Sequence, residues 1–252
     1  MDHPLTLVNR HLQYQKVSLV ATADSYYLHL AAEIDRNPLP FYWRKSARKR
    51  QWLGEAKAWC QSLEMQPEVI SAVTFEASLI PPGAGKFLRE RTDQAKIARY
   101  DVAVLVEVKD QEAMERIKAS AGYQELRQHM EAIARKHHCF EATNVRRIGP
   151  VDHDRQGVFL FNYFFADHLD QNLAVWEYTA GWFEQETKLD NSTVLLPLHP
   201  KEANYTIVNH CRWDGFRDIL PSLLFKRSFG RYVLDNFYAN QTAAMPILYR
   251  LA

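Results

Sequence analysis

The chain has 252 residues, of which 47% are hydrophobic and 24% are charged. These values predict a soluble globular protein with a large core and exclude a mostly disordered chain. The 31 basic and 30 acidic residues leave a formal charge of +1, so no overall positive field indicates a nucleic-acid partner. Three scattered cysteines and the lack of an apolar leader favour reduced thiols and a cytoplasmic location.

Residues 1–42 have the weakest periodicity in the chain. Apolar residues between Val17 and Leu30 fit one face of a helix, so the segment is expected to be an N-terminal helical extension. The alternative is a strand over KVSLVATA, residues 16–23. Pro38 ends either element, because the residue before a proline is biased away from the helical conformation.

A basic and aromatic stretch follows at residues 41–52. One interpretation is a peripheral contact with an anionic membrane, made by Trp43, Arg44, Lys45, Arg48, Lys49 and Arg50. The other is the solvated face of an ordinary amphipathic helix, whose buried side would hold Trp43, Ala47, Leu53, Ala56 and Trp59. Both interpretations remain open at the level of sequence.

The next segments alternate between strand-like and helix-like patterns. Residues 69–80 and 99–108 are apolar with a two-residue period, which predicts strands. Residues 111–138 have helical periodicity, and Gly122 within them predicts a kink or a split. Residues 140–149 then predict a closing strand.

The second half of the chain repeats this order. Its strand, helix, strand, strand, helix and strand are expected at residues 157–166, 172–186, 193–198, 205–213, 216–240 and 245–252. Tyr100 and Tyr205 open equivalent strands in the two halves, and Tyr123 and Tyr232 lie in equivalent helices. Self-similarity in a fixed order indicates two copies of one βαββαβ unit.

Two such units in one chain resemble the dimeric α+β barrel superfamily, in which two ferredoxin-like units pair their sheets into one barrel. The resemblance implies an α+β fold, with tandem ferredoxin-like units at residues 43–149 and 157–252 forming a pseudo-dimeric barrel after the extension at residues 1–42. Homo-oligomers are compatible with it. Members include cofactor-independent monooxygenases, haem enzymes, small isomerases and stress proteins of no known activity, so the fold alone does not select a reaction.

Polar residues within the apolar strands of the second half are the candidate catalytic residues. Buried polar groups without partners cost about 1–3 kcal/mol each, and such groups in apolar surroundings often line ligand pockets. This reasoning selects Asn162, Tyr163, Asn209 and His210. The alternative is that the asparagines satisfy local backbone groups and that His210 lies on the surface.

Three further residues are candidate ligand contacts. Trp176 and Phe161 would form an apolar wall of the pocket, and Glu107 would place a carboxylate in an apolar strand of the first half. Burial of that carboxylate would raise its pKa and make it a base. The alternative for Glu107 is a solvated face or an ion pair.

No metal site is predicted, because neither HxxxH nor HExxH spacing occurs among the histidines. A single histidine ligand to haem is the exception that spacing does not exclude, with His210 or His199 as the first choices.

The leading hypothesis is a barrel that binds a small hydrophobic or aromatic molecule and oxygenates or isomerises it without a tightly bound organic cofactor. His210 would move the proton, since its ordinary pKa is nearest neutrality, and Asn162 and Asn209 would orient a carbonyl or stabilise an enolate. Two alternatives are a non-catalytic binding or scaffold protein at a membrane surface and a haem-binding protein.

Overall fold

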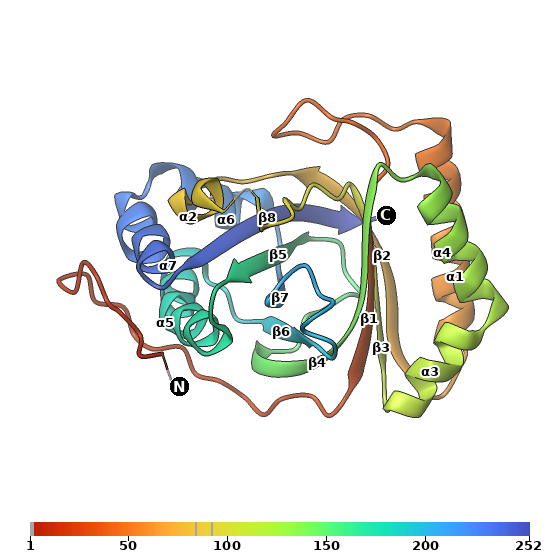
Figure 1. The fold of residues 1–252 in the computed structure, drawn as a ribbon, viewed down its shortest axis with the longest axis horizontal. Coiled ribbons are helices and arrows are strands. Elements are labelled where there is room, and N and C mark those ends of the chain that lie inside the picture. Colours follow the sequence, from red (N-terminus) through yellow and green to blue (C-terminus); the bar gives the residue numbers. More distant parts are fainter. Residues whose placement is uncertain (1–2, 84, 92) are drawn as a thin grey trace.

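The computed structural model describes residues 3–83, 85–91 and 93–252. Within them, eight strands form one closed barrel in which every neighbouring pair is antiparallel, and the helices lie outside it (Figure 1). The order around the barrel is β1-β3-β2-β8-β5-β7-β6-β4. A closed sheet leaves no unpaired edge strand.

The first half contains β1 (Tyr26–Glu33), α1 (Ala47–Glu64), β2 (Val69–Leu79), α2 (Lys86–Glu90), β3 (Val102–Val108), α3 (Gln111–Ala119), α4 (Ala121–Ile133) and β4 (Lys136–Gly149). The second half contains β5 (Val158–Ala166), α5 (Leu169–Thr187), β6 (Ser192–Pro197), β7 (Ile207–Trp213), α6 (Phe216–Phe225), the π-helix η1 (Phe229–Leu234), α7 (Asp235–Ala239) and β8 (Thr242–Leu251). The split expected near Gly122 occurs at Ser120, which ends α3 and caps α4.

The prediction of a barrel made of tandem ferredoxin-like units is confirmed by the strand order, although the first unit opens with β1 and not at residue 43. The first half contributes β4-β1-β3-β2 and the second half contributes β8-β5-β7-β6, which is the same arrangement twice. The two sheets join where β2 pairs with β8 and where β4 pairs with β6. The repeat-related Tyr100 and Tyr205 meet inside the barrel, with 2.7 Å between their hydroxyl oxygens.

The expected helix over residues 1–42 is wrong, because this segment holds strand β1 and otherwise extended chain in the described part. Residues 16–23 are not a strand either. Strand β1 is apolar on both sides, since Tyr27 and Ala31 join the barrel interior while Leu28 and Leu30 pack beneath the helices of the first half. Burial on both faces removes the alternation of polar and apolar residues that identifies a strand.

The segment before β1 is an N-terminal strap that crosses the helices of the second half (Figure 1). Asn240 Oδ1 accepts a hydrogen bond from the Thr6 N–H at 2.8 Å, and its Nδ2 donates to the Thr6 carbonyl at 2.8 Å. Asn236 makes the same pair of bonds to Val8. The strap also runs against Gly181 of α5, where a Cβ atom would collide with the Gln15 carbonyl.

Three apolar clusters hold the molecule together. One fills the barrel interior with aromatic rings, including Phe75, Phe161 and Tyr249. Another lies between the sheet of the first half and helices α1, α3 and α4, and a third lies between the sheet of the second half and helices α5, α6 and η1. The two helical layers therefore cover opposite sides of one packed barrel (Figure 1).

The basic stretch does not form a single surface. Helix α1 begins after Ser46, whose hydroxyl accepts a hydrogen bond from the Lys49 N–H. Trp43 and Ala47, expected on the buried side of the helix, are exposed because they lie before or at its start. Lys49 is 0% exposed, which removes it from any membrane contact. Among the described residues, no helix is long and apolar enough to cross a bilayer.

Candidate functional site

Asn162 in β5 and Asn209 in β7 lie opposite each other in the ladder between these strands. Both project to the helix side of the sheet, where they line the same cavity. The Asn209 Oδ1 atom accepts a hydrogen bond from the Ser192 hydroxyl. The Asn162 Oδ1 atom is buried and has no hydrogen-bond partner among the described residues. The two asparagines are therefore equivalent in position and different in hydrogen bonding.

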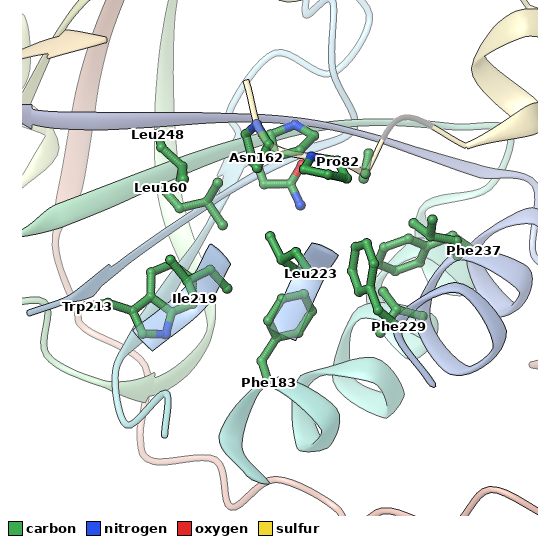
Figure 2. Close-up of a pocket in the computed structure, with 16 residues that line it drawn as sticks. Pro82, Leu160, Asn162, Phe183, Trp213, Ile219, Leu223, Phe229, Phe237 and Leu248 are labelled. Atoms are coloured by element: carbon green, nitrogen blue, oxygen red, sulfur yellow. The ribbon is translucent and has the colours of Figure 1, made fainter. Parts of the chain in front are cut away.

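Two adjoining cavities meet at Asn162; they contain about 390 and about 370 Å³ of empty space including the part open to solvent, and about 30 Å³ in each is wide enough for a water molecule. We call them together the helix-side cavity. Its shared lining residues are Leu160, Asn162, Phe183, Trp213 and Phe237. Figure 2 shows Asn162 projecting from the sheet into this space, across from Phe183 and Leu223 of the helical layer. A largely apolar pocket with few polar groups is the usual form of a small-molecule site.

Helix α6 and the π-helix η1 form the wall that faces the sheet. Helix α6 begins at Gly215, whose N–H donates to Asp218 Oδ2 at 2.9 Å. The Trp182 indole N–H donates to the Ser228 hydroxyl at 3.0 Å and so fixes α5 against the start of η1. Phe229 and the following turn of η1 then reach the cavity. π-Helical turns are rare and are often found at functional sites.

The other predicted catalytic residues face the barrel interior. His210 Nδ1 lies 3.0 Å from the Leu160 carbonyl and therefore donates to it, which leaves Nε2 to accept from His153 Nε2 at 2.9 Å. The ring of His210 stacks on Phe161 with 4.2 Å between ring centroids. The Tyr163 hydroxyl lies 2.9 Å from His29 Nε2. These groups form two separate hydrogen-bonded pairs within the aromatic core.

Burial keeps the histidines of these pairs neutral. It lowers the pKa of His29 to about 3 and holds the pKa of His210 well below its ordinary value. The same burial raises the pKa of Tyr163 well above its ordinary value. Both nitrogens of His210 are engaged, and its imidazole does not titrate near neutral pH.

The remaining two predicted residues lie in different places. Trp176 of α5 lines the helix-side cavity beside Asn209. Glu107 of β3 accepts hydrogen bonds from the Ser25 hydroxyl at 2.7 Å and from the Tyr27 hydroxyl at 2.8 Å, away from the cavity. The structure therefore brings Asn162, Asn209 and Trp176 together. It separates them from Tyr163 and His210, which face the barrel interior, and from Glu107.

Sequence reasoning missed most of the apolar wall of the cavity, including Phe183, Leu223 and Phe229. It also missed His29 and His153 as partners of Tyr163 and His210. One signal was present in the sequence, because adjacent residues of a strand point to opposite faces. Asn209 and His210 are adjacent, so they were bound to lie on opposite sides of the sheet.

No protein-family model and no curated protein matches this sequence. Solved structures do match. An anthrone oxidase-like protein is 9% identical with a TM-score of 0.61, over 90% of this chain and 91% of that one. A dye-decolorizing protein from V. cholerae is 10% identical with a TM-score of 0.52, over 92% and 95% of the two chains. A candidate monooxygenase from Lactobacillus acidophilus NCFM is 8% identical with a TM-score of 0.50, over 92% and 94%.

The chain has the dimeric α+β barrel fold. Each of these matches spans both halves, so the agreement concerns the complete α+β barrel and not a single ferredoxin-like unit. At such low identities the likeness is one of fold, and the chemistry has to be argued from the side chains of this α+β barrel.

The side chains around the helix-side cavity do not fit haem. No histidine is among the described residues that line it. His210, a first choice for the axial ligand, uses both ring nitrogens inside the barrel, and His199 has a side chain that is 66% exposed. Cys211 lines the cavity, but burial raises the pKa of its thiol, and a neutral thiol is a poor metal ligand.

Proposed function

We propose that this protein binds a small aromatic molecule in the helix-side cavity, with Asn162 as the group that orients it. The observation that carries the proposal is the buried Oδ1 atom of Asn162, which has no hydrogen-bond partner among the described residues and stands in an apolar pocket. An unpartnered buried acceptor costs about 1–3 kcal/mol. A bound molecule that donates a hydrogen bond from a hydroxyl or N–H group would remove this cost.

The reaction we propose is oxygenation of an enolisable aromatic ketone, for which anthrone is the model substrate. The likeness in fold to an anthrone oxidase-like protein and to a candidate monooxygenase supports this choice. The enol form of such a ketone carries a hydroxyl group that can donate to Asn162 Oδ1, whereas the ketone carries none. The acceptor would therefore favour the electron-rich enol, which is the form that O₂ oxidises.

The balanced reaction converts anthrone and O₂ to anthraquinone and water. Two C–H hydrogens leave C10 of the substrate, one oxygen atom is added there, and the other oxygen atom leaves as water. The apolar walls, including Leu223 and Phe229, would exclude bulk water from the reacting carbon. His210 has no part in this scheme, because it lies on the other side of the sheet with both ring nitrogens engaged.

Binding and turnover are tested separately. Titration with anthraquinone, the stable product, should quench the tryptophan fluorescence, since Trp176 and Trp213 line the cavity. Leu223→Trp, which fills the cavity, should abolish this binding. Leu224→Trp is the matched control, because the side chain of Leu224 is 55% exposed. Unchanged binding in Leu223→Trp would refute the location of the site.

Oxygen uptake with anthrone tests the reaction. We expect Asn162→Leu to retain binding of a purely hydrocarbon ring system, such as anthracene, and to lose the catalysed uptake of O₂. If the wild-type protein binds anthraquinone but does not accelerate uptake above the rate in buffer, the location of the site stands and the oxygenation proposal fails.

A second candidate function is a peripheral contact with an anionic membrane. Trp43 is 69% exposed and stacks on Phe41, with 5.0 Å between their ring centroids. Exposed aromatic side chains beside cations are typical of membrane-surface contacts. Lys45 pairs with Glu76 at 2.7 Å and Arg48 pairs with Asp35 at 3.8 Å. Arg44 and Arg50 are therefore the cations of this stretch without an ion pair to a described residue.

Flotation with vesicles of phosphatidylserine and phosphatidylcholine tests this function. We expect binding at low salt that weakens at high salt and is lost in Trp43→Ser. Met65→Ser is the matched control, since Met65 is 86% exposed at the far end of α1. Failure to float with the vesicles at low salt would refute the membrane contact.

A further inference from the structure

A hollow with basic walls lies at one end of the barrel, where β1 ends and β3 and β4 begin. We call it the basic hollow. It encloses about 1040 Å³ including the part open to solvent. Its basic lining residues are Lys96, Arg99, Arg135, Lys136 and His137. No carboxylate is among the described residues that line it, so the walls carry charge of one sign.

The cations of the basic hollow have few ion-pair partners, the neighbouring carboxylate being Glu33, which lies opposite Lys136 in the ladder between β1 and β4. Lys96, Arg99, Arg135 and Lys136 form no ion pair with any residue that the structure describes, and His137 lies 4.0 Å from Glu131. Glu131 already accepts a hydrogen bond from Arg127 at 2.8 Å. Like charges gathered in this way repel one another, and a bound anion would relieve the repulsion.

A buried polar group stands behind the wall of the hollow. His138 is 5% exposed, and its Nδ1 atom lies 3.0 Å from the Nδ2 atom of Asn204, a lining residue. The amide nitrogen can only donate, so Nδ1 accepts and the hydrogen of the neutral ring is on Nε2. That Nε2 atom is buried and has no partner among the described residues. His138 itself is not among the described residues that line the hollow, so its contribution is to hold Asn204 in place.

The remaining walls of the hollow suit an organic group. Tyr100 and Ile97 line it, and the Tyr100 hydroxyl is held by Tyr205 at 2.7 Å. The hollow shares no lining residue with the helix-side cavity. It is built mainly from the first half of the chain, whereas the helix-side cavity is built mainly from the second half.

We propose that the basic hollow binds a small molecule that carries a phosphate group. Arginine and lysine side chains supply charge-assisted hydrogen bonds to phosphate oxygens, and the partly exposed Ile97 offers an apolar surface to the rest of the ligand. The site does not depend on the oxygenation chemistry. It would let this α+β barrel respond to a second, anionic molecule.

The test uses the full chain and pyrophosphate as the probe. Isothermal titration at constant ionic strength should give saturable binding of one pyrophosphate per chain. The double variant Arg135→Gln and Lys136→Gln should weaken it about tenfold or more, because each cation supplies a charge-assisted hydrogen bond. Both residues are exposed, so thermal unfolding of the variant should match that of the wild type.

Lys109→Gln is the matched control, because Lys109 is an exposed cation directly after β3, at the opposite end of that strand. It should change the affinity less than twofold. Equal weakening in Lys109→Gln, or no saturable binding of pyrophosphate by the wild type, would overturn the proposal. Citrate is the competing class of anion, and a preference for citrate over pyrophosphate would overturn the phosphate assignment.

Discussion

Asn162→Leu should raise the stability of the ligand-free protein, which is the opposite of what most substitutions within a sheet do. The Asn162 Oδ1 atom has lost its hydration on folding and has gained no partner among the described residues. A leucine of similar size removes this cost and adds apolar surface to a cavity lined by Leu160 and Phe183. Removing an unsatisfied buried acceptor is worth about 1–3 kcal/mol, and in a domain of this length each kcal/mol raises Tm by about 2–4 °C.

Asn209 provides the matched control from the neighbouring strand. Its Oδ1 atom accepts a hydrogen bond from Ser192, which is 0% exposed. Asn209→Leu leaves that buried hydroxyl without its acceptor and should lower the stability by about 1–3 kcal/mol. Two identical substitutions at paired positions of one ladder are therefore expected to have opposite signs.

Equilibrium unfolding in urea, followed by tryptophan fluorescence, measures both changes. The slope with urea should be the same in all three proteins, so that differences in midpoint report stability. If Asn162→Leu destabilises the protein as much as Asn209→Leu does, then Asn162 has an internal partner. The proposal that Asn162 Oδ1 accepts a hydrogen bond from a bound molecule would then be refuted.

Three further predictions concern the rest of the chain. Burial lowers the pKa of His29 to about 3 in the folded barrel, whereas its pKa is about 6.5 in the unfolded chain. The contribution of His29 to stability is therefore complete above pH 6.5 and declines as the pH falls towards 3. Between pH 6.5 and 5 the free energy of unfolding should fall by about 2 kcal/mol because of His29. Urea unfolding at several pH values should show that the stability of His29→Gln depends less on pH. The buried carboxylate of Asp101 is 0% exposed and lies 3.4 Å from the ammonium group of Lys49. Lys49→Ala removes that cation and should lower the free energy of unfolding by about 3–5 kcal/mol in the same assay. Gly181→Val should displace the strap at Gln15, and faster proteolysis of the N-terminal segment would report it.

Specific results would contradict these three predictions. An equal loss of stability in His29→Gln and the wild type on acidification would contradict the prediction for His29. A loss below 1 kcal/mol in Lys49→Ala would mean that water reaches Asp101. Gly54→Val is the control for Gly181→Val, because a new Cβ at Gly54 would have no heavy atom within 4 Å beyond its own helix backbone and chain neighbours. Equal protection from protease in both variants would refute a tight contact between Gly181 and the strap.

The sequence was sufficient for the repeat and for most strands, because the strands of both halves are short apolar runs in the same order. It was insufficient for β1, whose two faces are both buried and therefore show no alternation. The strap was also missed, because its partners Asn236 and Asn240 lie more than two hundred residues away along the chain. Contacts between such distant segments leave no periodic signal.

The candidate site was predicted in part. Asn162, Asn209 and Trp176 do share a cavity, since polar residues in apolar strands are informative about pockets. The sequence did not reveal which of the two asparagines lacks a partner, because this depends on Ser192 from a third strand. The shape of the cavity depends on the π-helix η1 and on how α5 packs against it, and neither has a pattern that can be read from residue spacing.

The N-terminal strap has a consequence for biosynthesis. Its binding surface is made by α5, η1 and α7, and its partner Asn236 is translated more than two hundred residues after Val8. The strap is thus unable to dock until the helices of the second half have been translated and have folded. Attachment of the strap would then be a late event of maturation, when an early segment binds to the half of the protein that was made after it.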